Sequence, residues 1–389
     1  MRHDVLIAGA GPAGCLTAVV LARAGARVLV LDRARFPRDK LCGDTLNPGA
    51  LAVLRRLGLD VADAGLPLRG MLITGPGGAQ VRAAYPDGVT GRALVRRDLD
   101  RALLHRAVEA GAAVDEGVLV EAPLIETPAC AVTGVVVRAN GAVRRVHARI
   151  VIGADGRASR LARAVALAKH PHRPRRWALG AYFTDVAGMT GFGEMHVRCG
   201  FYIGVAPLPD GLTNACVVTA DRRKLQQPAT LLAQTLRNDP LLADRFAAAR
   251  MVTRPVSLGP MAVECAAPGL PGLLLAGDAA GFVDPMTGDG LRFALRGGEL
   301  AAQEALRVLE TGDPRAHERL AAARRREFST KVRFDRLLRR LAGSPGAVRL
   351  ASLASRLSSW PVERMVRYAG DLGATGLNGN FDPNLEPEP

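Results

Sequence analysis

A glycine-rich turn between two apolar segments, within the first 32 residues, restricts the fold of this chain more than any other feature. Residues 5–8 read VLIA, which is typical of a buried strand. A helix is expected over residues 12–24, with proline at its first position and Gly25 just after its end. Residues 26–32 then read ARVLVLD, a second apolar strand. Strand, helix and strand in this order predict a β-α-β unit, and therefore an α/β fold.

The turn itself has the spacing G-x-G-x-x-G, formed by Gly9, Gly11 and Gly14. The first glycine permits the bend, the second lets a pyrophosphate approach the backbone, and the third lets helix and strand pack closely. Free N–H groups at the helix start favour a phosphate. The carboxylate of Asp32, at the end of the second strand, can accept hydrogen bonds from a ribose. We therefore predict a dinucleotide site that comprises Gly9, Gly11, Pro12, Ala13, Gly14, Asp32 and Arg33.

Two later segments repeat the pattern of an apolar strand that runs into a Gly/Asp turn. They are residues 148–160, ARIVIGADGRASR, and residues 273–298, LLLAGDAAGFVDPMTGDGLRFALRGG. With these three motifs in this order, about the first 310 residues resemble the superfamily of FAD-dependent hydroxylases and reductases. This superfamily has an aromatic-hydroxylase-like fold and includes aromatic-ring hydroxylases, flavin halogenases and geranylgeranyl reductases. The resemblance implies that FAD is the cofactor.

Two stretches resemble the geranylgeranyl reductase branch most. Residues 38–48, RDKLCGDTLNP, are similar to its K-x-C-G-[DG] stretch. Residues 284–295, DPMTGDGLRFAL, are similar to its D-P-x-x-G-[ED]-G stretch. The chain departs from this branch at residues 201–209, FYIGVAPLP, where the branch often has Y-x-W-x-F-P.

The resemblance also implies roles for single residues. Asp155 and Gly156 match a motif that supports the pyrophosphate region of the cofactor, and Asp278 matches an acid that contacts the ribityl chain. Arg96 matches an arginine near the phosphates, with Arg97 as the alternative.

A helix is expected to begin after residue 290, and its positive N-terminus would stabilise the negative charge of a reduced flavin. From this segment we assign to the cofactor site Gly277, Pro285, Gly288, Asp289, Gly290 and Leu291. The sequence has no second G-x-G-x-x-G, so we expect no separate nicotinamide domain. Electrons would come from NAD(P)H that binds transiently, or from another reduced carrier.

The loop of residues 38–44 holds the candidate catalytic residues. In the family that the chain resembles, this loop runs beside the isoalloxazine, so Cys42 and Gly43 are assigned to the cofactor site. Cys42 either shapes the pocket or handles a proton, with its thiolate stabilised by Arg38 or Lys40. Asp44 either handles a proton or forms the turn.

We expect a Rossmann-like FAD-binding domain with an inserted antiparallel β-sheet substrate domain and C-terminal helices. Strand patterns with turns between them over residues 71–86 and 177–220 predict the inserted sheet. Within it, Phe201 and Tyr202 are candidates for substrate contact. The expected boundaries are residues 1–70, 92–165 and 260–312 for the FAD-binding domain, 71–91 and 166–259 for the substrate domain, 313–377 for the C-terminal helical region, and 378–389 for a disordered tail.

Two reactions on a hydrophobic substrate fit these features, and the flavin supplies the difficult chemistry in both. The sequence favours reduction of a carbon–carbon double bond in a polyprenyl-type substrate, such as a geranylgeranyl group or a quinone side chain. The alternative is an NAD(P)H- and O₂-dependent monooxygenase that hydroxylates an aromatic or polyketide substrate. A minor alternative is a non-catalytic protein that binds flavin or lipid.

The net charge of +15 favours anionic partners. The chain lacks an aromatic-rich basic motif, so we predict no nucleic-acid partner. The helix pattern of residues 317–341 is basic and amphipathic, and indicates either contact with an anionic membrane or a solvated surface cap. The six cysteines have no metal-ligand or disulfide spacing, so we predict no metal site. The expected location is the cytoplasm, and contact of the basic helix with a membrane would place the protein at its inner face.

Overall fold

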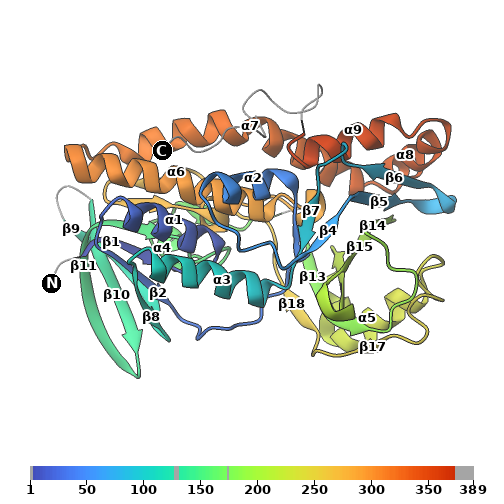
Figure 1. Ribbon diagram of the computed structural model, residues 1–389, viewed down its shortest axis with the longest axis horizontal. Helices are drawn as coiled ribbons and strands as arrows, with labels where there is room; N and C mark the ends of the chain where they lie inside the picture. Colours follow the sequence, from blue (N-terminus) through green and yellow to red (C-terminus); the bar gives the residue numbers. More distant parts are fainter. Residues whose placement is uncertain (1–2, 127–130, 173–174, 373–389) are drawn as a thin grey trace.

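A computed structural model describes residues 3–126, 131–172 and 175–372, which form two large sheets with helices around them (Figure 1). The first sheet has the order β20-β21-β11-β1-β2-β8, and β10 and β9 extend it from β11. From β21 to β8 all neighbouring strands are parallel. The strands are β1 (His3–Ala8), β2 (Val28–Asp32), β8 (Ala113–Glu116), β9 (Leu119–Glu126), β10 (Ala131–Ala139), β11 (Ala142–Gly153), β20 (Gly269–Leu270) and β21 (Leu273–Leu275).

Four helices cover one face of this sheet and share a single apolar core with it. They are α1 (Pro12–Arg23), α2 (Pro48–Arg56), α3 (Arg96–Glu109) and α6 (Gly290–Thr311). Helix α1 crosses α6 closely, because a Cβ atom at Gly298 would lie 2.5 Å from the Ala13 carbonyl oxygen. The opposite face packs against β9, β10 and the short helix α4 (Arg160–Ala164).

The second sheet has the order β17-β13-β16-β15-β14-β5-β6, with β18 also on β13. It is antiparallel except between β14 and β5. One face packs on α5 (Pro228–Arg237), and the other faces the first sheet's turns. The strands are β5 (Gly70–Thr74), β6 (Gln80–Ala84), β13 (Trp177–Thr184), β14 (Gly193–Arg198), β15 (Phe201–Pro207), β16 (Thr213–Thr219), β17 (Arg250–Met251) and β18 (Val256–Leu258).

Two small sheets connect these parts. One pairs β7 (Gly91–Ala93) with β3 (Thr45–Leu46) and β4 (Leu66–Leu68), and the other pairs β12 (Ala168–Lys169) with β19 (Glu264–Cys265). The predicted α/β class, with a parallel sheet, an antiparallel sheet and C-terminal helices, is confirmed. The boundaries between domains stay a prediction, and the tail predicted over residues 378–389 lies outside the described residues.

Three helices end the described chain: α7 (Ala316–Ala342), α8 (Pro345–Leu357) and α9 (Trp360–Ala369). Helix α7 runs along α6 (Figure 1), and the rings of Phe328 and Phe293 meet edge to face between them. Helices α8 and α9 pack beside the β5–β6 hairpin (Figure 1). Among the helices of the described ranges, none combines the length and apolar character that crossing a membrane requires.

Candidate functional site

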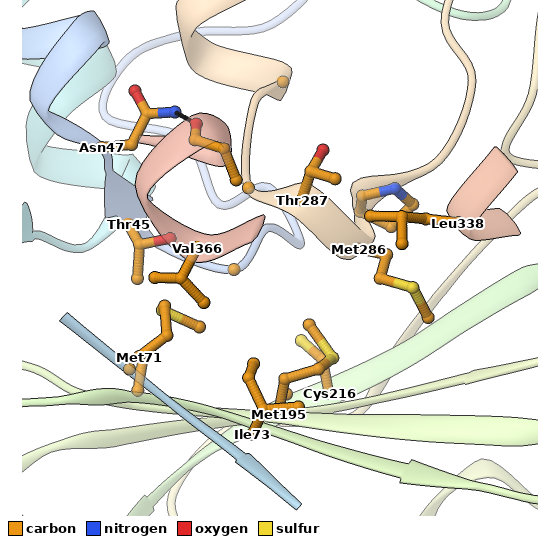
Figure 2. A pocket seen from close by; sticks show the side chains of 18 of the residues that line it. Thr45, Asn47, Met71, Ile73, Met195, Cys216, Met286, Thr287, Leu338 and Val366 are labelled. Atoms are coloured by element: carbon orange, nitrogen blue, oxygen red, sulfur yellow. Dashed lines mark hydrogen bonds between the residues drawn. The ribbon is translucent and has the colours of Figure 1, made fainter. Parts of the chain in front are cut away.

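A cavity of about 630 Å³ lies where the turns of the first sheet, one face of the second sheet and the C-terminal helices meet (Figure 2). The turns that follow β1, β11 and β21 all open onto it. The predicted site residues that line this cavity are Gly11, Pro12, Ala13, Cys42, Gly43, Arg96, Gly156, Gly277, Asp278, Pro285, Gly288, Gly290 and Leu291.

The glycine-rich turn has the geometry of an anion site. A Cβ atom at Gly11 would meet only the Arg38 guanidinium, at 3.7 Å, so this side of the turn is open. Helix α1 has no side-chain cap, and its first N–H groups are left for a ligand. Gly14 serves packing instead, because its Cβ would lie 1.9 Å from the Gly9 carbonyl oxygen.

The acid after β2 is tied to the turn by its own hydrogen bonds. Asp32 accepts from the backbone N–H of Ala10 at 2.7 Å and of Ala34 at 2.8 Å, and its side chain is buried. Arg33 is exposed and does not line the cavity. Asp32 is therefore placed to shape the edge of a ribose site, whereas Arg33 lies outside it.

The turn after β11 contains a buried polar atom without a partner. Asp155 accepts from the Arg160 N–H at 2.8 Å through Oδ2, while its buried Oδ1 has no hydrogen-bond partner among the described residues. Burial raises the pKa of this carboxyl group. The next residue, Gly156, has φ +79° and open space around its Cβ position. Asp155 does not line the cavity, so the open backbone at Gly156 is the part of this turn that can face a polar ligand group.

Of the two arginines that the sequence offered near the phosphates, Arg96 lines the cavity and Arg97 is exposed. Arg96 is buried, and its Nε and Nη2 atoms donate hydrogen bonds to the Asp100 carboxylate, the shortest from Nη2 to Oδ1 at 2.8 Å. Arg38 reaches the same carboxylate at 3.1 Å. Burial lowers the pKa of Arg96, but Asp100 and the Cys42 sulfur outweigh it, so the pKa is raised. The cavity floor is thus positively charged.

Lys40 adds to this charge. Its side chain lines the cavity and makes no hydrogen bond or ion pair with any residue in the described ranges. Burial, followed by the nearby Arg96, lowers its pKa. Together with the uncapped α1 terminus and the glycine turns, this cluster fits the pyrophosphate of a dinucleotide. Within those ranges, no group of His, Cys, Asp and Glu side chains has the arrangement of a metal site.

The loop before α6 corrects one expectation. Asp289 does not line the cavity; it is buried and accepts from Lys331 Nζ at 2.7 Å and from Asn47 Nδ2 at 2.9 Å. Lys331 also contacts the carboxylate of Asp371 at 2.6 Å. Neighbouring Gly288 and Gly290 do face the cavity, and the N-terminus of α6 has no side-chain cap. Asp289 therefore holds this loop against α7, and the backbone beside it faces the ligand space.

Lys331→Met should loosen this loop. We expect the free energy of unfolding to fall by about 3 kcal/mol, because Asp289 would lose its buried cation, and we expect FAD to bind more weakly. Urea unfolding and FAD titration measure the two effects. Lys169→Met is the matched control: its exposed ammonium lies 4.0 Å from Glu264 and should contribute about 0.5 kcal/mol or less. Equal losses in both variants would contradict the proposed role of Lys331.

The loop that holds Cys42 closes the cavity beneath the second sheet. Cys42 lines the cavity, and its carbonyl oxygen accepts from Asn214 Nδ2 at 2.6 Å and from the Cys216 thiol at 3.4 Å. All cysteines of the described residues are free thiols. Asn214 and Cys216 come from β16, so this contact joins the loop to the second sheet.

Asp44 is buried behind Cys42, with φ +55°. One carboxylate oxygen accepts from the Arg96 N–H at 3.0 Å, and the other accepts from Asn214. The neighbouring Tyr182 side chain also lowers the pKa of this carboxyl group. Burial raises the pKa of Asp44 to about 7, against the lowering effect of these hydrogen bonds. The site therefore contains a carboxyl group that changes protonation near neutral pH.

The two aromatic residues expected at the substrate lie on opposite faces of the sheet. Phe201 packs on the α5 side, away from the cavity, which argues against substrate contact there. Tyr202 lies on the cavity side but is fully packed, and its hydroxyl donates to Asp284 at 2.7 Å. Neither residue lines the cavity, because the alternation of the strand turns one away and buried contacts occupy the other.

The apolar wall comes from residues that the sequence did not single out. Figure 2 shows Met71, Ile73 and Met195 on the sheet side, across from Val366 and Leu338 of the C-terminal helices. The strand pattern of residues 71–86 was the only signal for part of this wall. Further apolar residues from the β5–β6 hairpin, β14 and the helices continue it: Val81, Val197, Val348, Val362 and Met365.

The sequence model of the family described as "FAD binding domain" matches residues 2–334. The chain belongs to this family. A menaquinone reductase of Mycobacterium tuberculosis is 34% identical over 321 residues, which cover 77% of this chain and 76% of that protein. A digeranylgeranylglycerophospholipid reductase of Methanopyrus kandleri is 28% identical over 380 residues, which cover 94% and 93%. The chain is therefore an FAD-dependent oxidoreductase, as predicted, and FAD as its cofactor is confirmed.

Solved structures share the fold. A geranylgeranyl bacteriochlorophyll reductase-like protein of Thermoplasma acidophilum superposes with a TM-score of 0.77 at 21% identity, covering 97% of this chain and 94% of that one. A flavin-dependent brominase superposes with a TM-score of 0.81, also at 21% identity, covering 95% and 94%. The flavoprotein fold thus serves both reductases and halogenases, and the fold alone does not select the reaction.

Proposed function

We propose that this oxidoreductase reduces a carbon–carbon double bond in a polyprenyl-type substrate, such as a geranylgeranyl group or the side chain of a quinone. The observation that carries the proposal is the continuity of one cavity, charged at the glycine turns and apolar from Met71 to Val366. A long apolar chain can lie along this wall with one double bond near the charged end. The reductase names of the curated relatives support the same choice.

Saturating one double bond requires a hydride and a proton. Bound FAD, once reduced, supplies the hydride, and NAD(P)H or another reduced carrier must supply its two electrons. The protein holds two candidate proton sites on the loop beside this space. Cys42 lines the cavity, and Asp44 lies behind it with a pKa of about 7. The apolar wall excludes water from the reacting carbons.

Anaerobic turnover tests this proposal. The enzyme is reduced, freed of excess reductant, and mixed with a prenylated quinone, a geranylgeranyl lipid or a phenolic polyketide. We expect a prenyl substrate to reoxidise the flavin and to gain two hydrogen atoms, detected by mass spectrometry. A parallel reaction with NADPH reports whether this carrier bleaches the flavin.

The same experiment separates the alternatives. A hydroxylated product that forms only with O₂ would replace the reductase proposal with monooxygenase activity. A flavin that stays reduced with every substrate, in air-free and aerated samples, would favour a binding protein.

We also propose that the protein meets its substrate at a membrane surface, through the C-terminal region that contains the basic helix α7. A polyprenyl chain dissolves in the bilayer. A protein that takes up such a chain without spanning the membrane needs a surface that binds lipid. The charge of +15 supports an anionic partner.

A further inference from the structure

The C-terminal helices carry a cluster of exposed apolar side chains. Of the 13 large apolar side chains that are exposed among the described residues, six fall between residues 337 and 360. We call this cluster the α8 patch; its members are Leu337, Leu341, Leu350, Leu353, Leu357 and Trp360. Exposed apolar side chains that gather on neighbouring helices in this way indicate an interaction site.

Packing within the protein does not account for the patch. Leu350, Leu353 and Leu357 are 68%, 58% and 88% exposed and recur along one face of α8. The helix is held from its other face, where Val348 and Ser352 are buried beside the β5–β6 hairpin. Helix α8 is thus apolar on the face that points to solvent.

The segment that carries the patch is basic. Residues 336–362 contain five arginines and no Asp or Glu. Arg336, Arg340, Arg349 and Arg356 are exposed among the leucines. Leucines and tryptophan flanked by arginines match the acyl and headgroup regions of an anionic bilayer.

The patch also lies beside an opening of the large cavity. Ala354, Ser358 and Pro361 line the cavity and are themselves exposed, so the cavity reaches the surface between α8 and α9. An apolar molecule that leaves a bilayer at the patch therefore enters the cavity without crossing water.

We propose that the α8 patch docks on anionic lipid and places this opening against the acyl region of the membrane. The docking surface is formed by α8 and the ends of α7 and α9, and not by the length of α7. The docking surface deepens the membrane contact proposed above by assigning it to these residues, and the identity of the molecule that enters rests on the proposed reductase function.

Flotation with vesicles tests the docking surface. Full-length, FAD-loaded protein is mixed with vesicles of phosphatidylglycerol and phosphatidylcholine, or of phosphatidylcholine alone. We expect it to float with the anionic vesicles and to be released by salt. Leu350→Ser/Leu353→Ser/Leu357→Ser should lower partitioning at least about tenfold, and Arg340→Gln/Arg349→Gln about fivefold for each arginine.

Control variants change exposed apolar residues and exposed arginines outside the patch. Val108→Ser/Val143→Ser replaces side chains that are 51% and 53% exposed, and Arg101→Gln/Arg145→Gln removes exposed arginines. Both controls should float like the parent protein. Flavin content and thermal unfolding verify that every variant is folded.

The fluorescence of Trp360 gives a second measurement of docking, which does not depend on a variant that binds less. It is one of two tryptophans, and the other, Trp177, is only partly exposed within β13. Anionic vesicles should shift the emission of the parent protein to shorter wavelength, and Trp360→Phe should abolish the shift. Parent protein that stays unbound, or patch variants that float and shift like the parent, would overturn the docking surface. Reductase turnover of a detergent-dispersed substrate is scored separately, so the failure of one proposal is not read as the failure of the other.

Discussion

Gly11→Val should give a folded protein that retains no FAD. A Cβ atom at this position meets no protein atom closer than 3.7 Å, and the nearest is the end of the flexible Arg38 side chain, so we expect the free energy of unfolding of the apoprotein to change by about 1 kcal/mol or less. The added isopropyl group would instead fill the open side of the turn at the start of α1, where a pyrophosphate approaches the backbone. Absorbance of the purified protein and titration with FAD measure the loss.

Gly14→Ala provides the contrast within the same motif. Its Cβ would lie 1.9 Å from the Gly9 carbonyl oxygen, so β1 and α1 would have to separate. We expect a loss of more than about 4 kcal/mol of stability, seen as insoluble or unfolded protein. Gly346→Ala, which meets no atom within 4 Å, should leave both stability and flavin content unchanged. A yellow Gly11→Val protein would show that the cofactor does not use this turn.

The gathering of the glycine turns could be predicted from sequence because it follows from strand pairing. β1, β11 and β21 are adjacent and parallel, so the turns that contain Gly11, Gly156 and Gly277 leave the sheet at the same edge. Each motif carries its own local signal, an apolar run followed by glycine. To predict that these turns cluster in space, it is enough to know that the carboxyl ends of parallel strands lie at the same edge of the sheet.

The surroundings of Asp44 could not be found in this way. Tyr182 and Asn214 are opposite each other in the pairing of β13 with β16, and that register depends on the whole second sheet. Neither residue lies in a motif, and both are far from Asp44 along the sequence. A carboxyl group with a shifted pKa is therefore a tertiary property of this chain.

Two causes explain why other predicted site residues do not line the cavity: the face of a strand on which a residue lies, and ion pairs between distant residues. Both faces of β15 are buried, so the apolar sequence FYIGVAP gives no sign of which residues face the cavity. The acid in the D-P-x-x-G-[ED]-G stretch matched a motif, yet Asp289 turns to Lys331, 42 residues later. The wall from α8 and α9 was missed because small and apolar helix residues resemble any surface helix.

Asp44→Asn should lower turnover about 100-fold and flatten its dependence on pH. Burial raises the pKa of Asp44 to about 7, so its protonated form is populated near neutral pH, and we expect this form to be the active one. Turnover of the parent enzyme should therefore fall as the pH rises through about 7. Asparagine keeps the shape and tolerates the positive φ, but it has no proton to release.

The pH dependence of the free energy of unfolding tests the raised pKa of Asp44 independently of turnover, and its direction is defined. Burial raises the pKa of Asp44 from 3.8 to about 7, so the folded state binds this proton more tightly than the unfolded state. The associated stabilisation, about 4 kcal/mol, is complete below pH 3.8 and is lost as the pH rises through about 7. The difference in unfolding free energy between Asp44→Asn and the parent should therefore change over this range, measured by urea unfolding at each pH.

Asp335→Asn separates the effect of a buried acid on stability from an effect on turnover. Burial, followed by the nearby Asp289, also raises the pKa of Asp335 to about 7, but Asp335 lies on α7, whereas Asp44 lies on the loop directly behind the cavity-lining Cys42. Removal of the Asp335 carboxyl group should change the pH dependence of stability in the same direction and leave the pH dependence of turnover as in the parent. If both variants alter stability alone, Asp44 is a buried structural acid, and the proton for the double bond must come from Cys42 or from water.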